Sequence, residues 1–231
     1  MTRHISTTMI EYIREATVDR DMRFYSIAEN FYEKMMDELG AGNYRNQSDD
    51  SVLFDAKLVG SEYSDLLILL IDSVSEKTKP KFGGNSVKSG YALGTYKQKQ
   101  RFIVINNLVE GKPVTYNINK DYFIHEFIHY LDWKRSGGHK PSFSDKTTLE
   151  EYFNSPTEYN AYYQEAANFV VKMLMDDKIL DKFKERYKNY KDFYEWMTAQ
   201  VFDKNFIKYL NASNKVKLQK RVYNIYDKFF N

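Results

Sequence analysis

Three residues near the middle of the chain have the types and the spacing of a metal site. Residues 121–132 read DYFIHEFIHYLD and contain His125, Glu126 and His129. Histidines four residues apart on a helix emerge on one side, about 6 Å apart along the axis. Their imidazole nitrogens can then bind one tetrahedral ion, beside which Glu126 can take a proton from a bound water. The pattern predicts a metal centre that activates water.

The neighbouring residues predict the helix that must position these side chains. We expect it to begin near Asn119 and to end at Ser136, where Gly137 and Gly138 stop it. Apolar residues fill the rest of its circumference and would fix the ligands by burial. They are Phe123, Ile124, Phe127, Ile128 and Leu131.

Composition limits the ligands that such a site can use. The 231 residues include no cysteine and four histidines, three of which lie between positions 125 and 139. The absence of cysteine excludes a disulfide scaffold, a Cys-ligated zinc finger, an iron–sulfur site and a thiol nucleophile. Any metal ion must therefore be held by His, Asp or Glu.

On these residues the chain resembles the zincin metallopeptidases, whose zinc helix carries the HExxH motif. The metzincin branch is excluded, because Asp132 and Arg135 stand where it has Gly and His. The gluzincin branch takes a third ligand from a later helix, and residues 155–167 (SPTEYNAYYQEAA) match that pattern. Ser155 and Pro156 open a helix there, and Glu158 lies in its first turn.

The resemblance implies one Zn²⁺ per chain and a peptide or protein substrate. Under it, His125, His129 and Glu158 bind zinc, and Glu126 acts as general base and then as general acid. Four other residues remain alternative ligands. They are Glu150, Glu151, Glu165 and His139.

Less specific roles follow from residues near the motif. Where thermolysin-like proteins have an Asp four residues after the ligand Glu, this chain has Tyr162. The hydrogen-bond partner of the first histidine, His125, is therefore unassigned, and Asp132 and Glu165 are the candidates. Oxyanion or substrate contacts would come from four side chains. They are Tyr159, Tyr162, Tyr163 and His139.

The predicted elements form an α+β fold that is mostly α-helical, zincin-like, with a small β-hairpin sheet beside the HExxH helix. Residues 91–96 and 101–105 form the hairpin, and 101–105 (RFIVI) is either an internal strand or the edge that receives an extended substrate. Residues 52–59 favour a strand, and 40–51 a loop. The predicted helices cover 22–39, 61–76 around the run LLILLI, 147–153, 157–176, 178–188, 190–202 and 213–230.

We expect one continuous globular unit with three parts. Residues 1–78 form an N-terminal helical part, 79–176 the zincin-like core, and 177–231 a C-terminal helical part. The last part has 13 Lys and Arg against 8 Asp and Glu from residue 176 onward. Its aromatic residues recur at helical spacing, which is typical of a buried stripe with a solvated Lys face, so nucleic-acid binding is not expected.

Net charge and hydropathy limit the cellular locations that we expect for the protein. Thirty-four Lys and Arg against 32 Asp and Glu give a net charge of +2. No apolar run is long enough for a membrane span, and no signal peptide is visible, so we expect a soluble cytoplasmic protein or a virion component. The Lys-, Asn- and Tyr-rich composition suits an AT-rich bacterial or phage genome.

The alternative function is a metal-binding structural or interaction protein of a larger, for instance viral, assembly with little or no hydrolytic activity.

Overall fold

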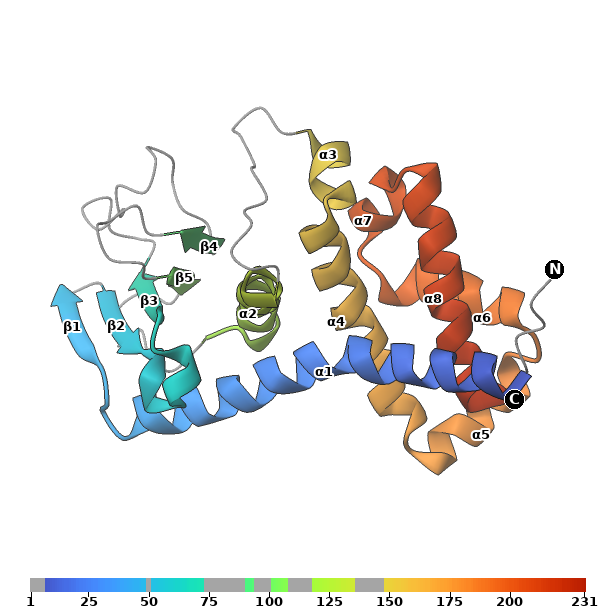
Figure 1. The fold of residues 1–231 in the computed structure, drawn as a ribbon, viewed down its shortest axis with the longest axis horizontal. Coiled ribbons are helices and arrows are strands. Elements are labelled where there is room, and N and C mark those ends of the chain that lie inside the picture. The colour runs from blue at the N-terminus through green and yellow to red at the C-terminus, as the bar shows by residue number, and fades with distance from the viewer. Residues whose placement is uncertain (1–6, 49–50, 73–89, 94–100, 108–117, 136–147) are drawn as a thin grey trace. The chain divides into compact units, whose positions relative to one another are not determined.

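A computed structural model of the protein describes six segments of the chain (Figure 1). The described segments are residues 7–48, 51–72, 90–93, 101–107, 118–135 and 148–231. They are mostly helical and include a small mixed sheet, which confirms the predicted α+β class. Two compact units divide the chain: Ser26–Arg135, and Met1–Tyr25 together with Ser136–Asn231. The division predicted at residues 78 and 176 stays a prediction.

The unit Ser26–Arg135 contains a five-stranded sheet in the order β1-β2-β3-β5-β4. Strands β3 and β5 are parallel, with Ile68 opposite Ile103, and the other neighbours are antiparallel. The strand bounds are β1 Arg45–Ser48, β2 Ser51–Asp55, β3 Leu66–Asp72, β4 Gly90–Leu93 and β5 Arg101–Asn107. Short 3-10 turns at Ala56–Leu58 and Ser61–Tyr63 connect β2 to β3.

The helix predicted over residues 61–76 is wrong, because its apolar centre is strand β3. Alternate residues Leu66, Ile68 and Leu70 are fully buried, while Leu67 and Leu69 are partly exposed. A continuous apolar run fits a buried strand and a buried helix equally well, so periodicity could not separate them. Parallel pairing with β5, more than thirty residues later in the chain, decides in favour of the strand.

The predicted hairpin is confirmed, and of the two alternatives for residues 101–105 the structure selects the internal strand. Strands β4 and β5 are antiparallel, with Tyr91 opposite Ile103. Strand β5 pairs on both sides, with β3 and β4, and Ile103, Val104 and Ile105 are buried. The internal-strand alternative therefore holds for residues 101–105. Among the described strands, β4 lies at that edge of the sheet.

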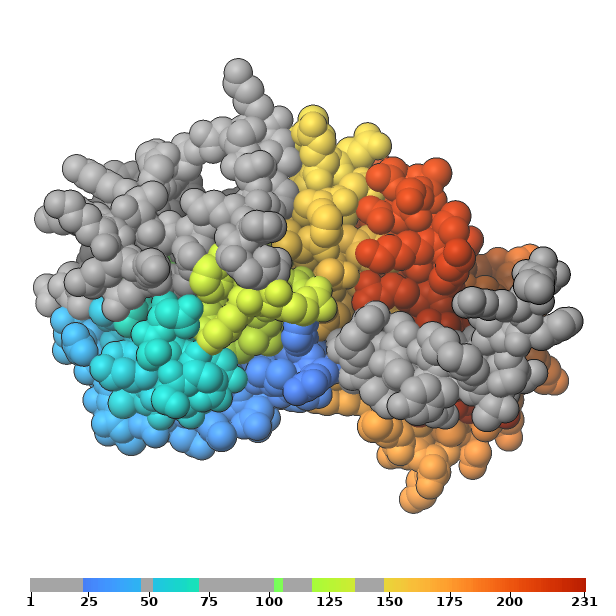
Figure 2. Space-filling model, in the orientation of Figure 1, coloured from blue at the N-terminus to red at the C-terminus, as the bar shows by residue number. Residues whose placement is uncertain are grey.

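Helices α1 (Thr7–Gly40) and α2 (Lys120–Arg135) confirm the helices predicted over 22–39 and 119–136. Chain reversal after α1 uses Gly42 at a φ of +82°, a left-handed conformation that glycine adopts without strain. The ring of Phe31 on α1 packs against Phe127 on α2, with centroids 4.3 Å apart. Figure 2 shows residues 118–135 beside residues 51–72 on the visible face.

The second unit contains the C-terminal helices, most of which the sequence predicted. Their bounds are α3 Leu149–Asn154, α4 Pro156–Leu174, α5 Asp177–Arg186, α6 Tyr190–Trp196, α7 Lys204–Tyr209 and α8 Ala212–Phe230. A π-helical turn at Met197–Val201 extends α6. Helix α7 was missed and lies just after the region predicted as 190–202.

The aromatic stripe of the C-terminal helices is core, as its spacing predicted. Phe193 and Phe206 are fully buried, and Tyr187 and Phe202 nearly so. Further aromatic side chains of the region pack against this core, namely Phe183, Tyr190, Tyr194, Trp196, Tyr209, Phe229 and Phe230. Among the described helices, none is both long and apolar enough to cross a membrane.

Candidate metal centre

Helix α2 places His125 and His129 on the same side, one turn apart, as their spacing predicted. Their ring centroids lie 4.7 Å apart with the planes at 84°. Each histidine is 8% exposed. The other side of the helix is apolar: Phe123 and Phe127 are fully buried and stack at 5.7 Å. The core therefore fixes the rotation of α2, and with it the direction of both imidazoles.

Polar contacts at the end of α2 hold the same rotation. The hydroxyl of Tyr130, next in sequence to His129, donates to Oδ1 of Asp65 at 2.7 Å. The Lys134 ammonium donates to the Tyr130 hydroxyl at 3.1 Å and to the carbonyl of Glu62. Sequence reasoning missed this cluster, because Tyr130 and Lys134 show only ordinary helical spacing and Asp65 is 65 residues away. No local signal could have found it.

Helix α4 begins as the sequence predicted and carries Glu158 in its first turn. Pro156 is the first helical residue, and Ser155 is the N-cap, whose Oγ accepts a hydrogen bond from the Glu158 N–H at 3.3 Å. Glu158 is 5% exposed. Burial of a carboxylate is costly without a compensating partner, so this side chain calls for a cation or strong hydrogen-bond donors.

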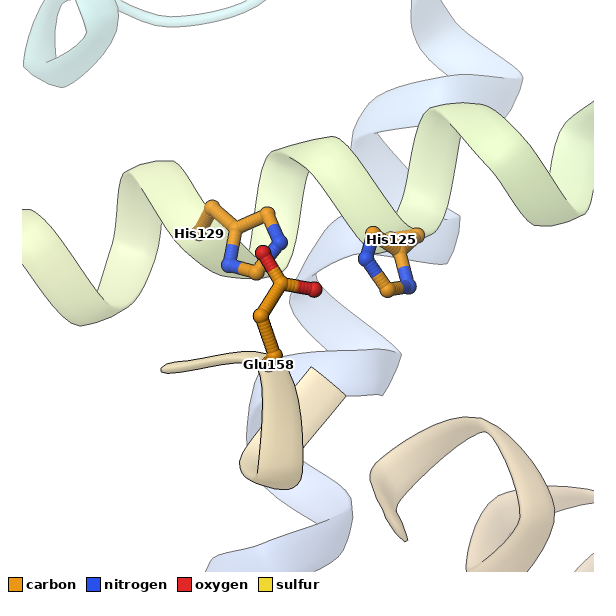
Figure 3. Close-up of side chains that lie close together, drawn as sticks. All are labelled: His125, His129 and Glu158. Atoms are coloured by element: carbon orange, nitrogen blue, oxygen red, sulfur yellow. The ribbon is translucent and has the colours of Figure 1, made fainter. Parts of the chain in front are cut away.

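The three residues predicted as ligands form one group (Figure 3). One ligand atom from each of His125, His129 and Glu158 lies within 4.8 Å of the others. In Figure 3 the carboxylate of Glu158 points toward the two imidazole rings. Two imidazoles and one carboxylate are a donor set that zinc accepts, with a fourth position left for water. The described part of the chain thus contains a buried group that could hold a metal ion.

The rival ligands are placed differently. Glu150 and Glu151 are exposed. The Glu151 carboxylate accepts from the N–H and hydroxyl of Thr148 in a capping box, which lowers the pKa of Glu151. Glu165 is half-buried on α4, outside the group. His139 lies outside the described residues.

The carboxylates predicted to be the general base or the hydrogen-bond partner of a histidine lie on the same helices as the ligands. Asp132, one turn after His129, is 5% exposed and accepts a hydrogen bond from Arg135 at 3.0 Å. Glu126 is half-buried on α2, next to His125. The roles of Asp132 and Glu165 as partners of a histidine stay predictions.

The three tyrosines proposed as oxyanion donors differ in their surroundings. Tyr159 and Tyr163 are 0% and 1% exposed and belong to the helical core. Cations from α8 cover their rings: Lys217 lies 4.3 Å from the Tyr159 centroid and Arg221 3.7 Å from that of Tyr163. These contacts indicate a packing role for both tyrosines.

Tyr162 packs against the same helical core, with its ring centroid 5.1 Å from that of Phe153 and stacked on Phe206 at 5.5 Å. It follows Glu158 by one helical turn and is only partly buried. Burial raises the pKa of Tyr162 to about 12, the Tyr152 side chain opposes this by a hydrogen bond, and the Glu158 charge adds to it. Tyr162 is neutral at pH 7, as a tyrosine with an ordinary pKa of about 10 also is. The donor role of the three tyrosines stays a prediction.

Comparison with known proteins identifies no relative of this chain. No protein-family model matches the chain, and neither the curated proteins nor the solved structures give a match. The capacity to hold a metal therefore rests on the His125, His129 and Glu158 geometry, and the zincin resemblance on the HExxH motif and the helix that carries Glu158.

Proposed function

We propose that the protein is a zinc-dependent hydrolase that cleaves peptide bonds. The observation that supports this most strongly is the group formed by His125, His129 and Glu158, whose ligand atoms lie within 4.8 Å of one another. Burial adds support, because each of the three ligands is at most 8% exposed, and two imidazoles with one carboxylate are a donor set that zinc accepts.

Each residue of the proposed site has one role in peptide hydrolysis. When bound by His125, His129 and Glu158, zinc would polarise the substrate carbonyl and lower the pKa of a water molecule. A carboxylate oxygen of Glu126 takes a proton from the attacking water and then delivers it to the leaving amine. Tyr162, which lies one helical turn after Glu158 on α4 and is protonated at neutral pH like other tyrosines, would donate a hydrogen bond to the developing oxyanion.

Burial of the ligands also favours a second candidate. A metal ion held by side chains of 8%, 8% and 5% exposure would suit a structural site in a protein that binds partners and cleaves nothing. The two candidates share the same metal centre. They differ in whether a water at the fourth position reacts with a substrate.

Metal content measured beside cleavage separates the candidates. We expect the purified protein to bind one zinc per chain and to cleave members of an unbiased peptide library. A chelator should abolish this cleavage, and added zinc should restore it. One zinc per chain without chelator-sensitive cleavage would favour the structural candidate. Absence of stoichiometric zinc binding would contradict both.

A further inference from the structure

The side chain of Asn154 joins three helix ends in the C-terminal unit. Its Nδ2 donates to the carbonyl of Glu150 at 2.7 Å, within α3, and to the carbonyl of Tyr209 at 2.8 Å, the last residue of α7. Its Oδ1 accepts from the N–H of Asn211 and from Nδ2 of Asn214, both at 2.9 Å. A carboxamide has two N–H donors and two acceptor lone pairs, so all four are used.

Two of the partners of Asn154, the Tyr209 carbonyl and the Asn211 N–H, are backbone groups at helix ends. The Tyr209 carbonyl belongs to the final turn of α7, and Asn211 is the N-cap of α8, with its side chain accepting from the Asn214 N–H at 2.8 Å. Helix ends need such partners, since their terminal N–H and C=O groups have none within the helix. Asn154 therefore links the ends of α7 and α8 to the end of α3.

Aromatic packing accompanies these hydrogen bonds. Phe153 is 5% exposed and stacks on Tyr209 with the planes 3° apart and the centroids at 6.1 Å. Its ring also meets Phe206 of α7 edge-on at 6.2 Å. Because adjacent residues of α3 are held by α7 and α8 through both apolar and polar contacts, the end of α3 has little freedom to move.

Asn154 directly precedes the cap of the helix that carries Glu158. Ser155 follows Asn154 and accepts the hydrogen bond from the Glu158 N–H. N–H groups of a first helical turn have no intrahelical acceptor, so the cap residue sets where that turn begins and how it is oriented. A change at Asn154 is thus transmitted through one residue and one hydrogen bond to the backbone of Glu158.

We propose that Asn154 is a positioning residue for the Glu158 ligand, and that helices α7 and α8 set the metal affinity through it. This inference rests on the metal centre of the proposed function. A ligand held in its binding geometry before the ion arrives loses less conformational freedom on binding. Loosening the start of α4 should therefore weaken zinc binding without removing any zinc ligand.

The test compares zinc affinity in variants that remain folded. We expect Asn154→Ala to bind zinc about tenfold more weakly than the wild type, the lower end of what outer-shell partners cost. Asn214→Ala removes the two hydrogen bonds that its Nδ2 donates to Asn154, one to Oδ1 at 2.9 Å and one to the backbone carbonyl at 3.4 Å. It should weaken zinc binding in the same direction by less. Affinity is measured by competition with a chelating dye, and the folded fraction by circular dichroism.

A matched control separates positioning from stability. Asn189 caps α6 in the same unit, accepting from the Asp192 N–H at 3.1 Å. Asn189→Ala should lower the unfolding midpoint through the lost cap while leaving the zinc affinity unchanged. Equal losses of affinity in Asn189→Ala and Asn154→Ala would show a general stability effect and would overturn the proposal.

Failure of this proposal can be told apart from failure of the metal centre. Wild-type zinc affinity in Asn154→Ala and Asn214→Ala, with weak binding in Glu158→Gln, would overturn the positioning role alone. Wild-type affinity in Glu158→Gln would overturn the assignment of Glu158 as a ligand and the positioning role together. If Asn154→Ala does not fold, Asn214→Ala decides the outcome, because it leaves α3 and α4 unaltered.

Discussion

Glu126→Gln is expected to abolish peptide hydrolysis while zinc remains at about one per chain. The amide keeps the size of the side chain but cannot accept a proton from water. General acid–base catalysis contributes about 10²–10⁴-fold, and both proton transfers are lost here, so kcat/KM should fall at least about 10³-fold. Rates are measured on a peptide that the wild type cleaves, and zinc by atomic absorption.

The control for this variant is another carboxylate on the same helix. Asp121 is exposed in the first turn of α2. Asp121→Asn makes the same chemical change away from the histidines and should leave kcat/KM close to that of the wild type. Chelator-sensitive cleavage of undiminished rate in Glu126→Gln would show that this carboxylate is not the base.

Glu158→Gln is expected to lose most of its zinc. The neutral amide removes the negative ligand and leaves two imidazoles, which are too few for a stable site. Loss of an outer-shell partner already weakens zinc binding about 10–100-fold, so loss of a ligand should weaken it more than about 100-fold. Hydrolysis should fall in parallel and recover partly at high zinc concentration.

Glu150→Gln is the matched control, since Glu150 was an alternative ligand and is exposed on α3. Its zinc affinity and rate should equal those of the wild type. If Glu150→Gln lost zinc and Glu158→Gln retained it, the third ligand would be assigned to the wrong residue, although the two histidines would keep their role.

Local signals in the sequence were sufficient for the two helices that carry the group. The apolar residues around His125 and His129 predicted α2, and the glycines after it marked its end. Ser155 and Pro156 predicted the start of α4, which places Glu158 in a capped first turn. Such features depend on residues within one or two turns of each other, so they can be read from the chain directly.

Features that depend on distant residues were missed or misplaced. The uniformly apolar run LLILLI has no helical or strand periodicity, so the helix prediction failed there. Pairing with β2 and β5 makes this segment strand β3. Strand β1 lies within residues predicted as a loop, because its side chains are polar and only pairing with β2 makes it a strand. The position of β5 inside the sheet likewise follows from β3, which is distant in sequence.

The third metal ligand could be assigned only when the burial of each candidate side chain was known in addition to its spacing in the sequence. Four alternatives to Glu158 remained open, because a gap of 29 residues after His129 does not distinguish one carboxylate from another. Burial of Glu158 and exposure of Glu150 and Glu151 separate these three, while half-buried Glu165 lies outside the group. The Asn154 contacts, which reach Asn214 sixty residues away, could not be inferred from any pattern in the chain.

X-ray absorption at the zinc edge of the zinc-loaded protein tests the metal centre most directly, because it reports the atoms bound to the ion whether or not the protein is an enzyme. We predict two imidazole nitrogens at about 2.0–2.1 Å and carboxylate oxygen at about 2.0–2.2 Å, with the carboxylate contribution lost in Glu158→Gln. A zinc shell with fewer than two imidazoles, or one unchanged in Glu158→Gln, would contradict the assignment of His125, His129 and Glu158.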